Sequence, residues 1–235
     1  MKRVILSLIA ATAISSAASA QSVRFIQQTS ASEASSQSIQ QSAFSTTRLA
    51  AAEQRASSYT LDQRSNGLTS TSRETASSSV ARQSSQHVIT PVGSRTRIES
   101  SNSRSGYDVQ SRSSVYGSSQ SSTLYGHQHS LTQESLQGGR VLVARESERA
   151  SGFVSSQSST TSPWGASQQS SSTVYTAARD SQTVQTPHLT VSTQRSSSEV
   201  QSQSSSSTVG PNGSFSHTQS SSTSRSTSTS ISIRS

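Results

Sequence analysis

The sequence predicts a low-complexity chain that is largely disordered as a monomer, with an all-β fold, a β-solenoid of nine-residue arms, as the alternative. Serine, threonine and glutamine dominate, whereas only 28% of the 235 residues are hydrophobic and 4% are aromatic. Ordering the backbone costs about 1–2 kcal/mol per residue, and burial returns only about 25 cal/mol per Å² of apolar surface, which favours disorder. The same polar residues pair well in stacked β-structure, which favours the alternative.

The first twenty residues have the pattern of a secretory signal peptide. A basic pair, Lys2 and Arg3, precedes an apolar stretch over 4–14. Small residues at the −3 and −1 positions, Ala18 and Ala20, predict cleavage before Gln21. The apolar stretch is shorter than the ~20 residues of a membrane span, and no second one follows it. We therefore expect a secreted protein, extracellular or at the cell surface, with no membrane span after leader removal.

Composition divides the remaining chain into four segments. We expect a Gln/Ala/Ser-rich N-terminal segment, a β region with a nine-residue repeat, a linker with an apolar patch, and a Ser/Thr-rich strand-like tail. In this order they cover 21–56, 57–135, 136–170 and 171–235.

The segment over 21–56 contains a stretch of good helix formers, 48–56, which predicts a brief helix, although isolated helices of this length are marginal in water. The next segment, 57–135, is defined by apolar residues that recur at intervals of nine. Self-similarity at a fixed period is typical of stacked repeats, and Val, Ile and Tyr are strand formers. We therefore predict a structural ladder formed by Val80, Ile89, Ile98, Tyr107, Tyr116 and Tyr125.

Turn residues and short apolar runs predict further strands. Two strands are expected around a turn at 90–93, and a strand at 141–143 after Gly138 and Gly139. Trp164 follows Pro163 in the predicted linker. The tail alternates Ser and Thr with Ile, which allows an extended strand but specifies its register weakly, since both faces carry similar residues.

No catalytic or cofactor motif is recognisable, so we expect no enzymatic activity and no cofactor. His127 and His129 would share a strand face, but two histidines without a carboxylate set do not make a metal site. The arginines stand singly, which argues against a nucleic-acid surface, and spaced guanidinium groups instead suit an anionic polysaccharide or cell surface. The chain has no cysteine and hence no disulfide.

The leader, the Ser/Gln/Thr enrichment, the absence of cysteine and the short strand-like repeats resemble the curlin type of secreted bacterial fibre subunit. The resemblance covers 57–135 and 171–235 and is one of composition. It implies a β-solenoid subunit that polymerises at the outer surface into a fibre or extracellular matrix and supports adhesion or biofilm. The alternative function is a disordered, Ser/Thr-rich extracellular coat protein without self-assembly.

Overall fold

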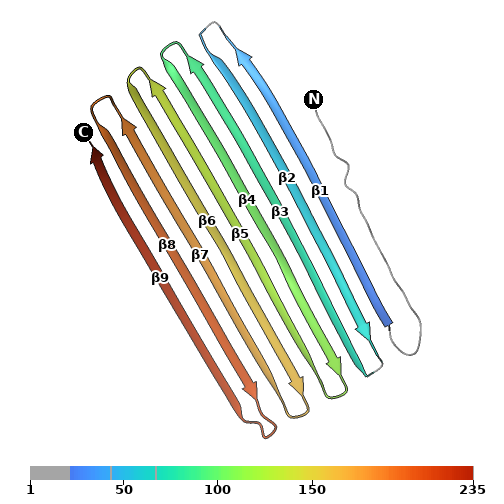
Figure 1. Ribbon diagram of the computed structural model, residues 1–235. Helices are drawn as coiled ribbons and strands as arrows, with labels where there is room; N and C mark the ends of the chain where they lie inside the picture. The colour runs from blue at the N-terminus through green and yellow to red at the C-terminus, as the bar shows by residue number, and fades with distance from the viewer. Residues whose placement is uncertain (1–21, 43, 67, 235) are drawn as a thin grey trace.

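The computed structural model describes residues 22–42, 44–66 and 68–234, which form one antiparallel sheet of nine strands in a single layer (Figure 1). Each strand pairs with its neighbours in chain order, so β1 and β9 are the two edges. The strands are β1 (Ser22–Gln41), β2 (Thr46–Ser65), β3 (Thr69–Thr90), β4 (Gly93–Ser114), β5 (Gly117–Gly138), β6 (Val141–Ser162), β7 (Gly165–Gln185), β8 (Thr190–Val209) and β9 (Phe215–Arg234).

This architecture confirms the all-β expectation and shows that the expectation of a disordered monomer is wrong. Serine, threonine and glutamine do not provide a core, but each residue still offers a backbone donor and acceptor that a sheet ladder satisfies. The strands contain 20 to 22 residues and pair antiparallel in an unclosed sheet, so the nine-residue arm is not their structural unit. Within the described residues, no helix is long and apolar enough to cross a membrane.

The hairpin turns recur every 24 residues, a period that the nine-residue interpretation missed. The four prolines of the chain are spaced by multiples of 24 residues. Pro91 lies 72 residues, three periods, before Pro163, and Pro187 and Pro211 follow at intervals of 24. Proline lacks a backbone donor and is poorly tolerated inside a central strand. The prolines therefore mark positions where the chain must reverse.

A hydroxyl group closes most of these turns. The side chains of Thr90, Ser114 and Ser162 each donate a hydrogen bond to the carbonyl oxygen three residues later, at 3.0–3.1 Å. Glycine follows the turn at the equivalent positions Gly117 and Gly165, both with φ +145°. The turn at 90–93 and the strands on each side of it agree with the sequence prediction.

Register is equally regular until the last hairpin. Within one strand pair, the residue numbers of any two directly opposite residues have the same sum. This sum is 87 for β1 and β2, where Ser22 is opposite Ser65, and it rises by 48 at each following strand pair up to β7 and β8. Between β8 and β9 the rise is 49, from 375 to 424, because the loop between them (210–214) has five residues, whereas the first pair on either side of each earlier turn encloses two or four. A one-residue shift moves every side chain of a strand to the other face.

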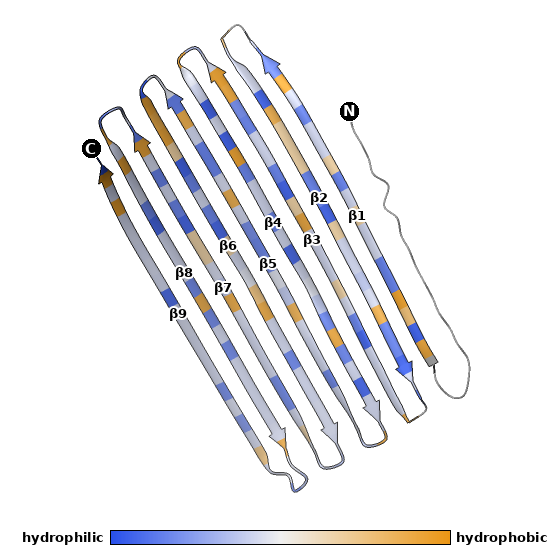
Figure 2. Ribbon diagram, viewed as in Figure 1, coloured by the Kyte–Doolittle hydropathy of each residue, from blue (hydrophilic) through white to orange (hydrophobic). Residues whose placement is uncertain are grey.

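Side chains alternate between the two faces, which we call face A, the face that carries Tyr107, and face B, the face that carries Tyr125. No described residue is buried on either face, and apolar residues lie as short bands spread over the strands (Figure 2). A sheet normally buries one face against another element. The structure therefore leaves two broad surfaces and two long edges open to a partner.

The predicted segments do not appear as separate structural units. The residues expected to form a helix, 48–56, lie inside β2, where antiparallel pairing on both sides overrides a weak local propensity. The predicted linker, 136–170, contains the whole of β6, and its Trp164 occupies a hairpin turn. The predicted signal peptide, 1–20, and its cleavage residues Ala18, Ala20 and Gln21 lie outside the described residues.

Candidate functional site

The residues of the predicted nine-residue ladder do not form one row. An odd spacing moves a side chain to the opposite face within a strand, because side chains alternate with period two. In β3, Val80 is on face A and Ile89 on face B; in β4, Ile98 is on face B and Tyr107 on face A. Tyr125 in β5 is on face B. Tyr116 lies in the turn between β4 and β5, with 80% of its surface exposed.

Three glycines inside strands lie under aromatic rings of the next strand. Gly106 is opposite Tyr125, and a Cβ at this glycine would lie 2.5 Å from the tyrosine hydroxyl. On face A, Gly126 is opposite Phe153 in the same arrangement. Such cross-strand glycine–aromatic pairs help to fix the register of a sheet.

The third pair joins three strands. Gly152 is opposite Tyr175, whose hydroxyl reaches across this glycine to hydrogen-bond with His127 Nδ1. The His127 and Tyr175 rings are stacked with centroids 6.0 Å apart. The absence of a side chain at Gly152 is what allows this contact between strands that are not neighbours. The three pairs together link β4, β5, β6 and β7 near their middles.

The predicted ladder residue Tyr107 makes a strong local hydrogen bond. Its hydroxyl donates to Glu74 Oε1 on β3 at 2.6 Å. This bond, with smaller effects from burial and from the charge of Glu74, raises the pKa of Tyr107 to about 12. The hydroxyl thus remains a donor at any ordinary pH and anchors β4 to β3.

Aliphatic side chains form an unbroken row on face A across five strands, near the strand ends. Direct pairing connects each member to the next, and branched cross-strand pairs are stabilising. The row, which we call the aliphatic row, consists of Leu136, Val143, Val184, Val191 and Ile233. Ile233 joins it because the last loop encloses an odd number of residues; if the pairing enclosed two or four residues, as at the earlier turns, Ile233 would lie on face B. The single departure from the 24-residue period therefore aligns β9 with its neighbours.

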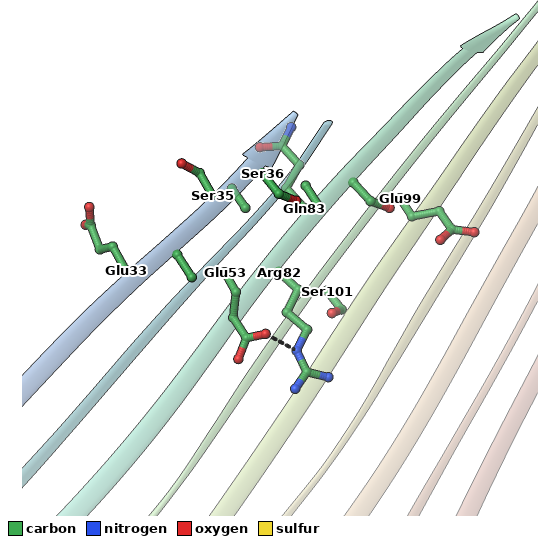
Figure 3. Close-up of a pocket in the computed structure, with 12 residues that line it drawn as sticks. Glu33, Ser35, Ser36, Glu53, Arg82, Gln83, Glu99 and Ser101 are labelled. Atoms are coloured by element: carbon green, nitrogen blue, oxygen red, sulfur yellow. Dashed lines mark ion pairs between the residues drawn. The ribbon is translucent and has the colours of Figure 1, made fainter. Parts of the chain in front are cut away.

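A shallow hollow on the sheet near β1 is lined by small and charged residues (Figure 3). In it, Arg82 Nε contacts Glu53 Oε2 at 3.2 Å. A hydrogen bond from Arg55, together with the charges of Arg55 and Arg82, lowers the pKa of the Glu53 carboxyl. The Glu53 carboxylate is therefore held between two arginines, as a stabilised ion pair rather than an isolated reactive group. The remaining labelled residues around it are Glu33, Ser35, Ser36, Gln83, Glu99 and Ser101.

The two histidines singled out in the sequence do share face B, one on each side of Gln128. His129 Nε2 lies 2.9 Å from Glu148 Oε1, and His127 is engaged by Tyr175. Across the described ranges, no group of three or more His, Asp or Glu residues could hold a metal ion.

The edges are the largest unpaired polar features. Along its outer side each edge strand, β1 or β9, leaves backbone donors and acceptors unpaired over 20 residues. On β9, Arg225 contacts Glu199 of β8 at 2.9 Å and keeps 70% of its side chain exposed. On β1, Glu33 accepts a hydrogen bond from Gln54 of β2 at 3.0 Å.

Sequence reasoning missed the glycine–aromatic pairs and both edges. The glycine–aromatic pairs left a signal in the sequence, because a glycine is adjacent to an aromatic residue at 106–107, 125–126 and 152–153. The edges required knowledge of strand order. In the comparisons with known proteins, no protein-family model matches the chain, and no curated protein matches it either.

Proposed function

We propose that this chain is a secreted structural protein whose copies add to one another at the sheet edges to form a surface fibre or extracellular matrix. In this role it supports adhesion or biofilm, without catalysing a reaction and without a cofactor. The leader pattern of the sequence supports export, and the fibre role agrees with the compositional resemblance to curlin subunits.

The observation that carries the proposal is the combination of two long open edges with the lack of any buried side chain among the described residues. Soluble proteins protect sheet edges with short strands, lysine, proline or bulges. Here β1 and β9 each extend over 20 residues without lysine or proline. Adding a copy converts these unpaired groups into ladder hydrogen bonds, and stacking a second sheet covers a face.

Exposed arginines support an anionic polysaccharide or cell surface as the second partner. The side chains of Arg64 and Arg225 are 68% and 70% exposed although each contacts a carboxylate. Guanidinium groups bind carboxylates in a fork geometry. A fibre repeats such groups many times, which converts weak single contacts into strong attachment.

The test is assembly of the protein that begins at Gln21. We expect fibres that bind an amyloid dye and diffract at about 4.7–4.8 Å along the fibre axis, the spacing of hydrogen-bonded strands. Seeds of preformed fibre should shorten the lag before assembly. A chain that stays monomeric for days at micromolar concentration, with no cross-β reflection, would support the coat protein without self-assembly instead.

A further inference from the structure

We propose that β9 of one copy pairs antiparallel with β1 of the next, with Ile233 opposite Val23 and Ile231 opposite Phe25. This inference rests on the proposed assembly at the edges and specifies which edges meet, in which orientation and in which register. The paired residue numbers sum to 256 in this arrangement.

Strand direction determines how the copies must be oriented. Successive strands alternate, so β1 and β9 of one copy run the same way. A simple translation would therefore produce a parallel pair at the junction, whereas every pair within the sheet is antiparallel. A half-turn of each new copy about the fibre axis reverses its strands and keeps β1 next to β9. It also places face B of the new copy beside face A of the previous one.

This half-turn brings the apolar side chains of the two edges together on one side of the junction. Face A of β9 carries Ile231 and Ile233 at one end, and face B of β1 carries Val23 and Phe25 at its opposite end. In an antiparallel pair these ends meet. The aliphatic row of face A, which ends at Ile233, then continues into Val23 of the next copy.

Several further positions of the register pair like with like, whereas His217 meets Ile39 and Phe215 meets Gln41. Thr227 meets Thr29, Gln219 meets Gln37 and Ser221 meets Ser35, since each pair of numbers sums to 256. Threonine and serine pairs across strands form hydrogen bonds, as Ser30 and Ser57 do inside the sheet at 2.7 Å. Glutamine ladders are a recurrent feature of stacked β-structure.

Charge separates this arrangement from pairing of identical edges. In the proposed register, Arg225 lies diagonal to Glu33 of the next copy, at about 7–8 Å between Cα atoms, within reach of long side chains. Pairing β9 with β9, with Phe215 opposite Ile233, would place two Arg225 side chains diagonal to each other. Pairing β1 with β1, with Phe25 opposite Ile39, would do the same to two Glu33 carboxylates. Among these three registers, the attraction between Arg225 and Glu33 arises only when unlike edges meet, although the same junction places Arg234 diagonal to Arg24 of the next copy.

An interface between unlike edges leaves the same two edges free at the ends of each assembly. Heterologous contacts of this kind generate open filaments when the rotation does not close a ring. The proposed junction thus accounts for unlimited growth, and it predicts that fibre ends expose β1 at one end and β9 at the other.

Cysteine cross-linking tests the junction, because the chain has no native cysteine. Ser221→Cys and Ser35→Cys would be placed in separate chains, mixed, assembled and oxidised. Directly opposite residues have Cα atoms about 4.5–5.5 Å apart, which suits a disulfide. We expect disulfide-linked dimers in the mixture, each containing one chain of either kind.

The matched control uses Ser222→Cys in place of Ser221→Cys. Residue 222 is on the opposite face, so its mixture with Ser35→Cys should give few linked dimers. Two single variants report on identical edges: Ser224→Cys would link β9 to β9, and Ser32→Cys would link β1 to β1. Efficient linkage in either single variant, or equal linkage in the control mixture, would overturn the proposed junction.

A second measurement uses the unmodified protein. Nine strands at about 4.7–4.8 Å give about 43 Å per copy along the fibre, and the half-turn doubles the true repeat to about 85 Å. We expect this doubled repeat in images of the fibres, whereas a repeat of about 43 Å alone would refute the half-turn. Fibres that lack the doubled repeat and the 221–35 linkage refute the junction while leaving the proposed function intact. A wild-type chain that forms no fibres refutes both.

Discussion

Replacing Gly165 with alanine should destabilise the sheet at the hairpin between β6 and β7. Gly165 has φ +145°, a conformation that side-chain-bearing residues rarely adopt, and a Cβ there would lie closer than 3.0 Å to the carbonyl oxygen of Val209. That carbonyl belongs to the end of β8, where Ala166 pairs with Val209. Relief of the contact would therefore require movement of two paired strands.

The magnitude follows from these two penalties. Residues in sparsely populated backbone regions cost about 1–3 kcal/mol each, and the backbone contact adds to this. A loss of about 1–3 kcal/mol lowers the ratio of folded to unfolded chains by about 5- to 150-fold. The contact alone can be measured at Gly93, where a Cβ would approach the carbonyl of Gln137 equally closely although φ is not positive.

The assay is urea unfolding followed by far-ultraviolet circular dichroism, at a concentration below that of assembly. With a slope of about 1–3 kcal/mol per molar urea, the Gly165→Ala midpoint should fall by about 1 M. Gly138→Ala is the matched control, since its Cβ would have no neighbour nearer than 3.5 Å, and its midpoint should stay close to that of the wild type. Equal midpoints for the two variants would refute the reasoning about the turn.

Three further predictions concern charge and register. The raised pKa of Tyr107, about 12 against an ordinary 10.0, means that the bond to Glu74 stabilises the sheet fully below pH 10 and is lost as the pH rises through about 12; a tyrosinate absorbance titration should show this late ionisation, and Glu74→Gln should remove it. Hydrogen bonds from Gln201 and Arg225 lower the pKa of Glu199 below 4.5, so its stabilisation is present above that pH and is lost on further acidification; a circular-dichroism acid titration should show a smaller loss for Glu199→Gln than for the wild type. Deletion of Asn212 should leave a two-residue turn between Gly210 and Ser214, which already share a backbone hydrogen bond, and should keep Ile233 on face A; the disulfide between Ser202→Cys and Ser222→Cys, which are directly paired in the wild type, should still form, and its loss would show that β9 has shifted.

The sequence contained enough information for the strand class and for several turns. The strand expected at 141–143 begins β6, and the turn at 90–93 separates β3 from β4. The period of nine was misleading, because it follows scattered Val, Ile and Tyr residues rather than the points where the chain reverses. The four prolines and the glycines that follow three of the turns, Gly93, Gly117 and Gly165, reveal the period of 24, since their backbone requirements are specific.

The assignment of side chains to faces could not be predicted locally. Serine and threonine occur on both faces of most strands, so alternation alone gives little reason to prefer one register. The face of Ile233, for example, depends on which residues pair across the loop over 210–214, many residues away along the chain. The edges depend on strand order, which no single segment specifies.

The constant rise of 48 in the pairing sum has a consequence for how such a chain can change in length. Removal or duplication of 48 consecutive residues, one full hairpin, restores the direction, face and register of every strand that follows. Recombination between hairpins would thus produce longer or shorter sheets in which the edge strands and their junction are unchanged. Strand length is fixed by the spacing of the turns, whereas strand number is free to vary between descendants of one gene.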